Sequence, residues 1–205
     1  MPSPARTDHV RLPDRAALKD AALAYLARFA ATELTLKRML DRKIDRALRR
    51  LSVRTAEDEQ DALREKAAGL KRMVPDIVRE MAGLNAVSDE AFAQGRTRSL
   101  RRSGHSLRAV QAHLAQRGVA SEMIDEAMDS LAVRIGEDTD TELAAALIFA
   151  RKRRAGPFAA KEQDETRTLA AFARAGFSQD IARQALGMDP DEAEEMILNF
   201  RSGGW

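Results

Sequence analysis

The sequence predicts an all-α fold, an elongated tandem array of three-helix repeats, and two observations support that prediction. The first is that residues 88–131 divide into three short amphipathic helices with turns between them. Each predicted helix begins at a serine that can cap free backbone amides, namely Ser88, Ser106 and Ser121. Gly104 and Gly118 follow the first two helices and suit a left-handed helix exit.

The second observation is a repeated pattern. Leu114-Ala-Gln-Arg-Gly-Val119 is echoed 58 residues later by Phe172-Ala-Arg-Ala-Gly-Phe177. A large apolar residue stands ten residues after each glycine, Met128 in one case and Leu186 in the other. A fixed offset that carries the same turn and the same apolar spacing predicts repeats that bury their faces on one another.

Composition fits slender helices and excludes several classes of protein. The 205 residues are 44% hydrophobic but only 4% aromatic, and the formal net charge is +2, so attraction to an acidic partner must come from local patches. The lack of cysteine excludes disulfides, zinc thiolate sites and cysteine nucleophiles. No apolar run is long enough for a membrane span or a signal peptide, so we expect no membrane contact and a cytoplasmic location.

The first part of the chain is predicted to hold a disordered arm and one repeat. Residues 1–14 carry three prolines without apolar periodicity, which is typical of a disordered arm. Residues 15–84 are predicted to form the first repeat with an extra helix, and Thr32 is expected to cap its second helix. Pro75 interrupts the heptad rhythm of residues 55–83, so we expect one helix to end near Met73 and another to begin near Pro75.

The remaining boundaries follow from turn residues. Asn85 tolerates a left-handed conformation and is expected to turn the chain into the second repeat, residues 85–132. The third repeat is predicted at residues 137–200, and residues 201–205 are expected to form a loose end that carries Trp205.

The sequence gives little support for catalysis. His9, His105 and His113 lack metal-ligand spacing, and Gly104 and Gly118 do not belong to a phosphate-binding loop. Paired carboxylates stand where acidic residues suit helix starts or solvent. We therefore predict no catalytic residue, no cofactor and no metal.

Basic clusters are the more informative chemistry. The candidate partner-binding residues are Arg96, Arg98, Arg101, Arg102 and Arg108 in the second repeat and Arg151, Lys152, Arg153 and Arg154 in the third. The helix dipole also favours cations at helix ends, which explains part of the pattern. A guanidinium group binds phosphate and carboxylate alike, so charge alone does not choose between nucleic acid and an acidic protein surface.

Two other segments have simpler explanations. A further set of cations on one helix is expected to be a solvated face, namely Arg38, Arg42, Lys43, Arg46, Arg49 and Arg50. Residues 106–131 could form a helix-turn-helix, but the second helix carries Glu122, Asp125 and Asp129, which disfavour contact with DNA phosphates.

Several motifs in order resemble one known family. Asp89-Glu-Ala-Phe-Ala93, then Arg96 through Ser106, then Leu114 through Val119, resemble the central repeat of the RecX family of regulators of the RecA recombinase. Matching motifs on either side extend the resemblance over about residues 15 to 187; they are Ala24-Tyr-Leu-Ala27, Ala150 through Phe158, Ala175-Gly-Phe-Ser178 and Ile181 through Leu186.

The resemblance implies a curved array of three-helix repeats that lies in the groove of the RecA filament. It implies a monomeric, non-catalytic regulator that chiefly inhibits the filament's ATPase and strand exchange in recombination, DNA repair and the SOS response. The residues themselves leave other functions open: a helical nucleic-acid-binding protein with a weak or direct DNA contact through its basic patches, or a hydrolase with an unrecognised site.

Overall fold

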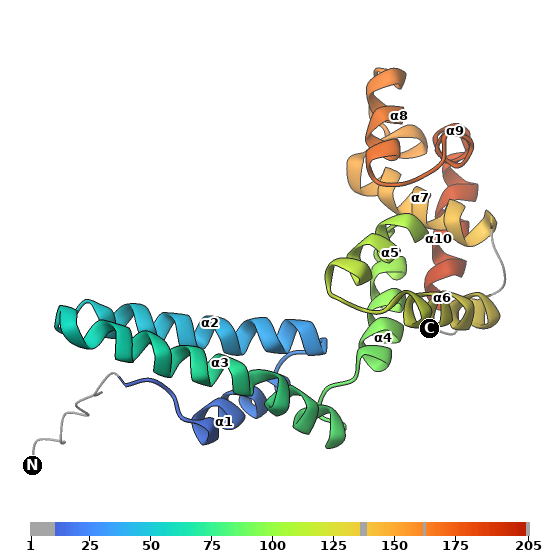
Figure 1. The fold of residues 1–205 in the computed structure, drawn as a ribbon. Coiled ribbons are helices and arrows are strands. Elements are labelled where there is room, and N and C mark those ends of the chain that lie inside the picture. The colour runs from blue at the N-terminus through green and yellow to red at the C-terminus, as the bar shows by residue number, and fades with distance from the viewer. Residues whose placement is uncertain (1–10, 136–138, 162, 204–205) are drawn as a thin grey trace, which may run out of the picture. The chain divides into compact units, whose positions relative to one another are not determined.

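The computed structural model describes residues 11–135, 139–161 and 163–203, and within them the regular elements are helices without strands (Figure 1). This confirms the all-α prediction. The chain divides into two compact units, Met1–Ser88 and Asp89–Trp205. Most of the predicted disordered arm, together with His9 and Trp205, lies outside the described residues. No described helix combines the length and the apolar character needed to cross a membrane.

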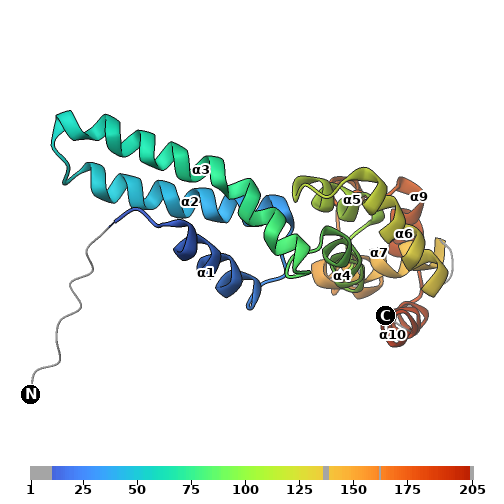
Figure 2. The same ribbon diagram turned by 60° about the horizontal axis from the view of Figure 1, so that its bottom comes forward.

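The first unit is built on a pair of long helices. It contains α1 (Arg15–Leu26), α2 (Glu33–Ser52), the 3₁₀ turn η1 (Glu57–Glu59) and α3 (Gln60–Gly83). Helices α2 and α3 run side by side, and α1 packs against both (Figure 2). The Thr32 hydroxyl accepts a hydrogen bond from the Thr35 amide at 3.1 Å, which confirms the predicted cap of α2. The buried side chains come from all three helices and include Leu18, Leu40 and Ile77.

The predicted break at Pro75 is wrong. Helix α3 continues through Pro75, although the proline ring removes the amide that would bond to the carbonyl of Lys71. Buried residues flank the proline on the same apolar stripe, with Ala67 and Val74 before it and Ile77 after it. Because these side chains fill the core shared with α1 and α2, packing outweighs the loss of one helical hydrogen bond.

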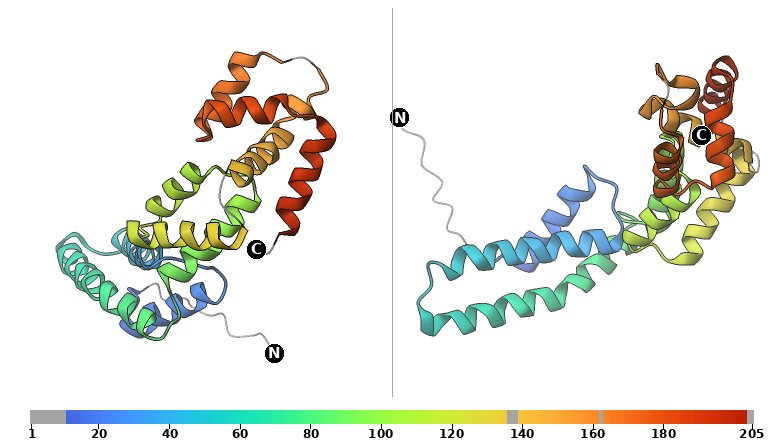
Figure 3. Two further views of the ribbon diagram at one scale, coloured as in Figure 1. Left: turned by 90° about the vertical axis from the view of Figure 1, so that its right-hand side faces the viewer. Right: turned by 90° about the horizontal axis from the view of Figure 1, so that it is seen from above.

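The second unit contains the second and third repeats. The second repeat consists of α4 (Asp89–Arg102), α5 (Leu107–Gln116) and α6 (Ser121–Ile135). The third consists of α7 (Thr139–Arg153), the 3₁₀ turn η2 (Gly156–Phe158), α8 (Glu165–Arg174) and α9 (Gln179–Gly187). A further helix, α10 (Pro190–Ser202), packs against α7 (Figure 3). Each repeat has its own core cluster, around Leu114 in the second and around Phe172 in the third.

Matching hydrogen bonds explain the sequence echo. Val119 donates its amide proton to the Leu114 carbonyl at 3.2 Å, and Phe177 donates to the Phe172 carbonyl at 3.1 Å. The intervening Gly118 and Gly176 have φ values of 81° and 89°, as predicted. Both helices therefore end in the same left-handed Schellman turn.

Three other helices end in the same way. Asn85 (φ 52°) closes α3 and Gly104 (φ 79°) closes α4, as the sequence predicted. Arg154 (φ 53°) closes α7, so the third repeat carries an arginine where the second repeat carries Gly104. A bulky residue with positive φ is uncommon and costs about 1–2 kcal/mol relative to the right-handed region.

Serine caps are confirmed for part of the pattern. The Ser106 hydroxyl accepts a hydrogen bond from the Ala109 amide at 3.1 Å at the start of α5. Ser178 occupies the same place before α9 and accepts from the Ile181 amide at 3.3 Å. Contrary to the prediction, Ser121 is the first residue of α6 and therefore does not stand in the capping position before the helix.

Candidate partner-binding surface

The candidate cations of the second repeat differ in exposure. Arg102 and Arg108 are exposed, whereas Arg96 and Arg98 are half-buried. The Arg96 Nε–H group donates to Nε2 of His113 at 3.1 Å, so this ring nitrogen acts as an unprotonated acceptor. Burial, together with nearby positive charge, lowers the pKa of His113 below its usual value.

Arg101 is not the exposed charge that the sequence led us to expect. Its side chain is 0% exposed, and its guanidinium donates to a carboxylate oxygen of Glu142 at 2.5 Å and to the His105 carbonyl at 2.8 Å. Glu142 lies on α7, so this ion pair joins the second repeat to the third. Burial lowers the pKa of Arg101, while the Glu142 carboxylate opposes that shift. Arg101 is therefore a link inside the fold and is removed from the exposed candidates.

An ion pair in the third repeat occupies a related position. Arg151, next to Ala150 in the last turn of α7, pairs with Glu194 on α10 at 2.8 Å, as Arg101 in the last turn of α4 pairs with Glu142 on α7. The pair at Arg151 is partly exposed, with 32% of the arginine side chain accessible. In the second and third repeats alike, an arginine near the end of the first helix pairs with a glutamate on a later helix, α7 in one case and α10 in the other.

The structure brings the ends of α4 and α7 together. The Lys152 ammonium donates to the Ser103 carbonyl at 2.6 Å, and Ser103 directly follows α4. A β-carbon on Gly104 would lie 2.6 Å from the Ile148 side chain, so the turn that ends α4 packs closely against the interior of α7. We call the exposed cations at these ends the basic surface; they are Arg102, Lys152, Arg153 and Arg154.

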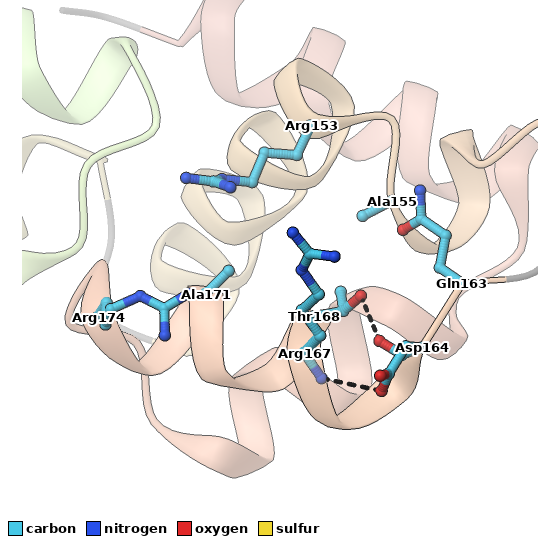
Figure 4. A pocket seen from close by; sticks show the side chains of 8 residues that line it. All are labelled: Arg153, Ala155, Gln163, Asp164, Arg167, Thr168, Ala171 and Arg174. Carbon is cyan, nitrogen blue, oxygen red and sulfur yellow. Dashed lines mark hydrogen bonds between the residues drawn. The ribbon is translucent and has the colours of Figure 1, made fainter.

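Next to the basic surface lies a hollow that the sequence did not reveal. It has a volume of about 420 Å³ and is lined by Arg153, Ala155, Gln163, Asp164, Arg167, Thr168, Ala171 and Arg174 (Figure 4). Arg167 and Arg174 were not among the predicted partner-binding residues. Their spacing of seven residues places them on one face of α8. Once the helix boundaries were known, this spacing could have identified them as neighbours on one surface.

A separate row of cations lies on α2 in the first unit. Arg38, Arg42 and Arg46 recur every four residues and are exposed, as are Lys43, Arg49 and Arg50. Among the described residues, none of these six forms an ion pair, whereas the neighbouring Lys71 pairs with Asp45 at 2.7 Å. The row is a solvent-facing positive stripe.

The described residues hold no group of three or more His, Cys, Asp or Glu side chains that could bind a metal ion. The arrangement instead offers guanidinium and ammonium donors at fixed positions, and such donors bind carboxylate or phosphate oxygens.

Comparison with known proteins identifies the family of the chain. Residues 88–128 match the family described as RecX, second three-helix domain. The chain is 37% identical over 177 residues to the regulatory protein RecX of Myxococcus xanthus, covering 84% of this chain and 86% of the relative. It is 36% identical over 174 residues to the regulatory protein RecX of Agrobacterium fabrum, covering 78% and 90%. No solved structure matches the chain. The chain therefore belongs to the RecX family of regulatory proteins.

Proposed function

We propose that this chain binds the filament of the RecA recombinase and restrains its ATPase and strand-exchange activities. In this role it acts as a monomeric, non-catalytic regulator in the cytoplasm, in recombination, DNA repair and the SOS response. The family relationship supports the partner, because its relatives are named regulatory proteins RecX.

The observation that carries the proposal is the paired placement of cations at the ends of α4 and α7. The contact between Lys152 and Ser103 joins the end of α7 to the end of α4, and the buried ion pair between Arg101 and Glu142 joins the end of α4 to the first turn of α7, so the two helices are held in a fixed relation. A filament repeats the same surface at regular intervals, so cations held at a fixed spacing can make several weak contacts that are jointly strong.

Measurement of filament ATPase on single-stranded DNA tests this proposal. Wild type should inhibit the ATPase, Arg98→Glu with Arg102→Glu should weaken inhibition, and adding Lys152→Glu and Arg154→Glu should weaken it further. Raised salt should act in the same direction, because exposed charge pairs are screened. Arg101 is left unchanged, since its replacement would disturb the fold.

Charge reversal at Arg183 and Arg201, two exposed arginines of the same unit, is the control for the change in net charge of the first pair. These replacements should leave inhibition near the wild-type level. If the four-residue variant remains folded and inhibits as wild type does at equal concentration, the basic surface is not the site of filament binding.

The α2 row favours an alternative function, direct binding to nucleic acid. Its unpaired cations could each neutralise a phosphate and release counterions, which would make binding strongly salt-dependent. Replacing Arg38, Arg42 and Arg46 by glutamate should then abolish binding to DNA in the absence of recombinase. If this variant loses DNA binding and filament inhibition together, contact with DNA rather than with the recombinase is the primary activity.

A further inference from the structure

Three guanidinium groups gather around the hollow beside α8, and none of them has a counter-ion among the residues that the structure describes. Arg153 comes from the end of α7, and Arg167 and Arg174 come from the two ends of α8. Figure 4 shows the three side chains around one space, with Ala171 between them. None of the three forms an ion pair with another described residue.

The hollow has an excess of positive charge. Among the described residues that line it, Asp164 is the acidic one, so three arginines and one aspartate give these residues a formal charge of +2. One carboxylate oxygen of Asp164 accepts a hydrogen bond from the Arg167 backbone amide at 3.1 Å and caps α8. The Asp164 carboxylate thus accepts from the backbone of α8. The guanidinium groups remain available to an external anion.

The surrounding residues hold the arginines ready for such an anion. The Arg153 guanidinium lies over the Phe149 ring, with its carbon 4.9 Å from the ring centroid. A guanidinium stacked in this way engages its face and leaves the N–H groups at its edge free to donate. Ala155 and Ala171 are buried and small, so they leave room between the arginines.

The spacing favours an extended anion over a single carboxylate. Arg167 and Arg174 are seven residues apart on one face of α8, which separates their backbones by about 10 Å along the helix axis. A carboxylate has two oxygens in one plane and is saturated by one or two guanidinium forks. Phosphate groups present oxygens in several directions, and two or more linked phosphates can span the distance between the arginines.

We propose that this hollow is a binding site for linked phosphate groups, supplied either by a nucleic-acid strand or by a nucleoside triphosphate. Arg167 and Arg174 would hold neighbouring phosphates, and Arg153 would donate from the opposite side. The proposal goes beyond the proposed function and does not depend on it. Arg153 belongs to both surfaces, but the test below changes only Arg167 and Arg174 of α8, which play no part in the filament test.

Fluorescence anisotropy of the whole protein without recombinase tests the proposal. The two probes are a fluorescein-labelled single-stranded oligothymidylate and a fluorescent ATP analogue, both at low salt. Arg167→Gln with Arg174→Gln should weaken binding of at least one probe by about tenfold or more, since the variant removes two charge-assisted contacts to phosphate. Arg183→Gln with Arg201→Gln removes the same charge from exposed sites outside the hollow and should change affinity by less than about threefold.

The two probes separate the sources of phosphate. Loss confined to the oligonucleotide assigns the site to a nucleic-acid strand, and loss confined to the ATP analogue assigns it to a nucleotide. Equal losses in the two double variants would reduce the effect to net charge and overturn the proposal. Failure of the wild-type protein to bind either probe would also overturn it. So would displacement of the probes by polyglutamate as effective as displacement by unlabelled phosphate ligands, if that displacement required Arg167 and Arg174. Thermal melts of both variants check that the fold is retained, and filament inhibition is measured separately.

Discussion

Ser106 and Gly176 are in contact across the boundary between the second and third repeats, where no β-carbon fits. The Ser106 hydroxyl donates to the carbonyl of Ala175 at 2.6 Å, and a β-carbon on Gly176 would lie 2.5 Å from that hydroxyl oxygen. The same serine caps α5 by accepting from the Ala109 amide. One side chain therefore fixes the start of α5 and the end of α8 together.

Gly176→Ala should destabilise the protein more than Gly118→Ala. Both glycines have positive φ, so either alanine costs about 1–2 kcal/mol. At Gly176 the new methyl group also collides with Ser106, and such overpacking costs about 1–3 kcal/mol more. Urea unfolding of both variants measures the difference. Equal losses of unfolding free energy in the two variants would mean that Ser106 moves away from the new methyl group without destabilising the protein.

Arg101→Met should lower the free energy of unfolding by about 3 kcal/mol or more, because it leaves the Glu142 carboxylate without its buried partner. Arg183→Met changes an exposed arginine of the same unit and should cost less than about 0.5 kcal/mol. Adding Glu142→Gln to Arg101→Met should recover part of the loss. Chemical unfolding gives all three values, and a small effect of Arg101→Met would show that the pair contributes little.

Pro75→Ala should stabilise the first unit. Alanine restores the amide that can bond to the Lys71 carbonyl, and proline in a helix interior costs up to about 3 kcal/mol relative to alanine. The exposed position of Pro75 makes loss of packing small. Gly69→Ala lies in the same helix, and its β-carbon would meet its neighbours at ordinary contact distances. This variant should raise the free energy of unfolding by about 1 kcal/mol, a value with which the effect of Pro75→Ala can be compared. A loss of stability in Pro75→Ala would show that the core depends on the proline.

Arg154→Gly should raise stability by about 1 kcal/mol while it weakens filament inhibition. Glycine accepts the left-handed conformation that Arg154 holds at φ 53°, as Gly104 does in the second repeat. The same change removes one cation of the basic surface. Thermal unfolding and filament ATPase inhibition are measured on one preparation. Arg154→Asn is a second variant that also relieves the backbone strain and removes the charge, so it should behave in the same way. Unchanged inhibition by both variants would exclude Arg154 from the filament contact.

Lowering the pH from about 7.5 to about 6 should reduce stability through His113. Burial, and then the charges of Arg96, Arg117 and His105, lower the pKa of the folded His113 below its usual 6.5. The unfolded chain therefore takes up a proton before the folded protein does, so stability falls as the pH drops through about 6.5 toward the lower pKa of the folded state. His113→Gln should flatten this dependence in urea unfolding. An identical pH slope in the variant would assign the effect to other groups.

Local chemistry explains how much of the fold was predictable. Thr32 and Ser106 cap helices and Asn85 and Gly176 end them through bonds to residues a few positions away, so the responsible atoms lie within one stretch of sequence. The apolar spacing around Leu114 likewise identified the buried face of its helix. These features confirmed the all-α repeats, and the family resemblance rested on the same stretches.

Tertiary packing decided what local chemistry could not. Arg98, Arg101 and Arg102 look alike in the sequence, yet Arg101 alone of these three is buried, because Glu142 arrives beside it from a helix 41 residues further along the chain. Pro75 remains helical because Val74 and Ile77 belong to a core built with other helices. Arg153 and Arg167 line one hollow only when α7 and α8 are brought together. Local sequence accounts for the helix ends at Thr32, Ser106, Asn85 and Gly176, since those bonds are short-range. The packing of distant segments determined which charges are exposed, since burial depends on neighbours that the local sequence does not contain.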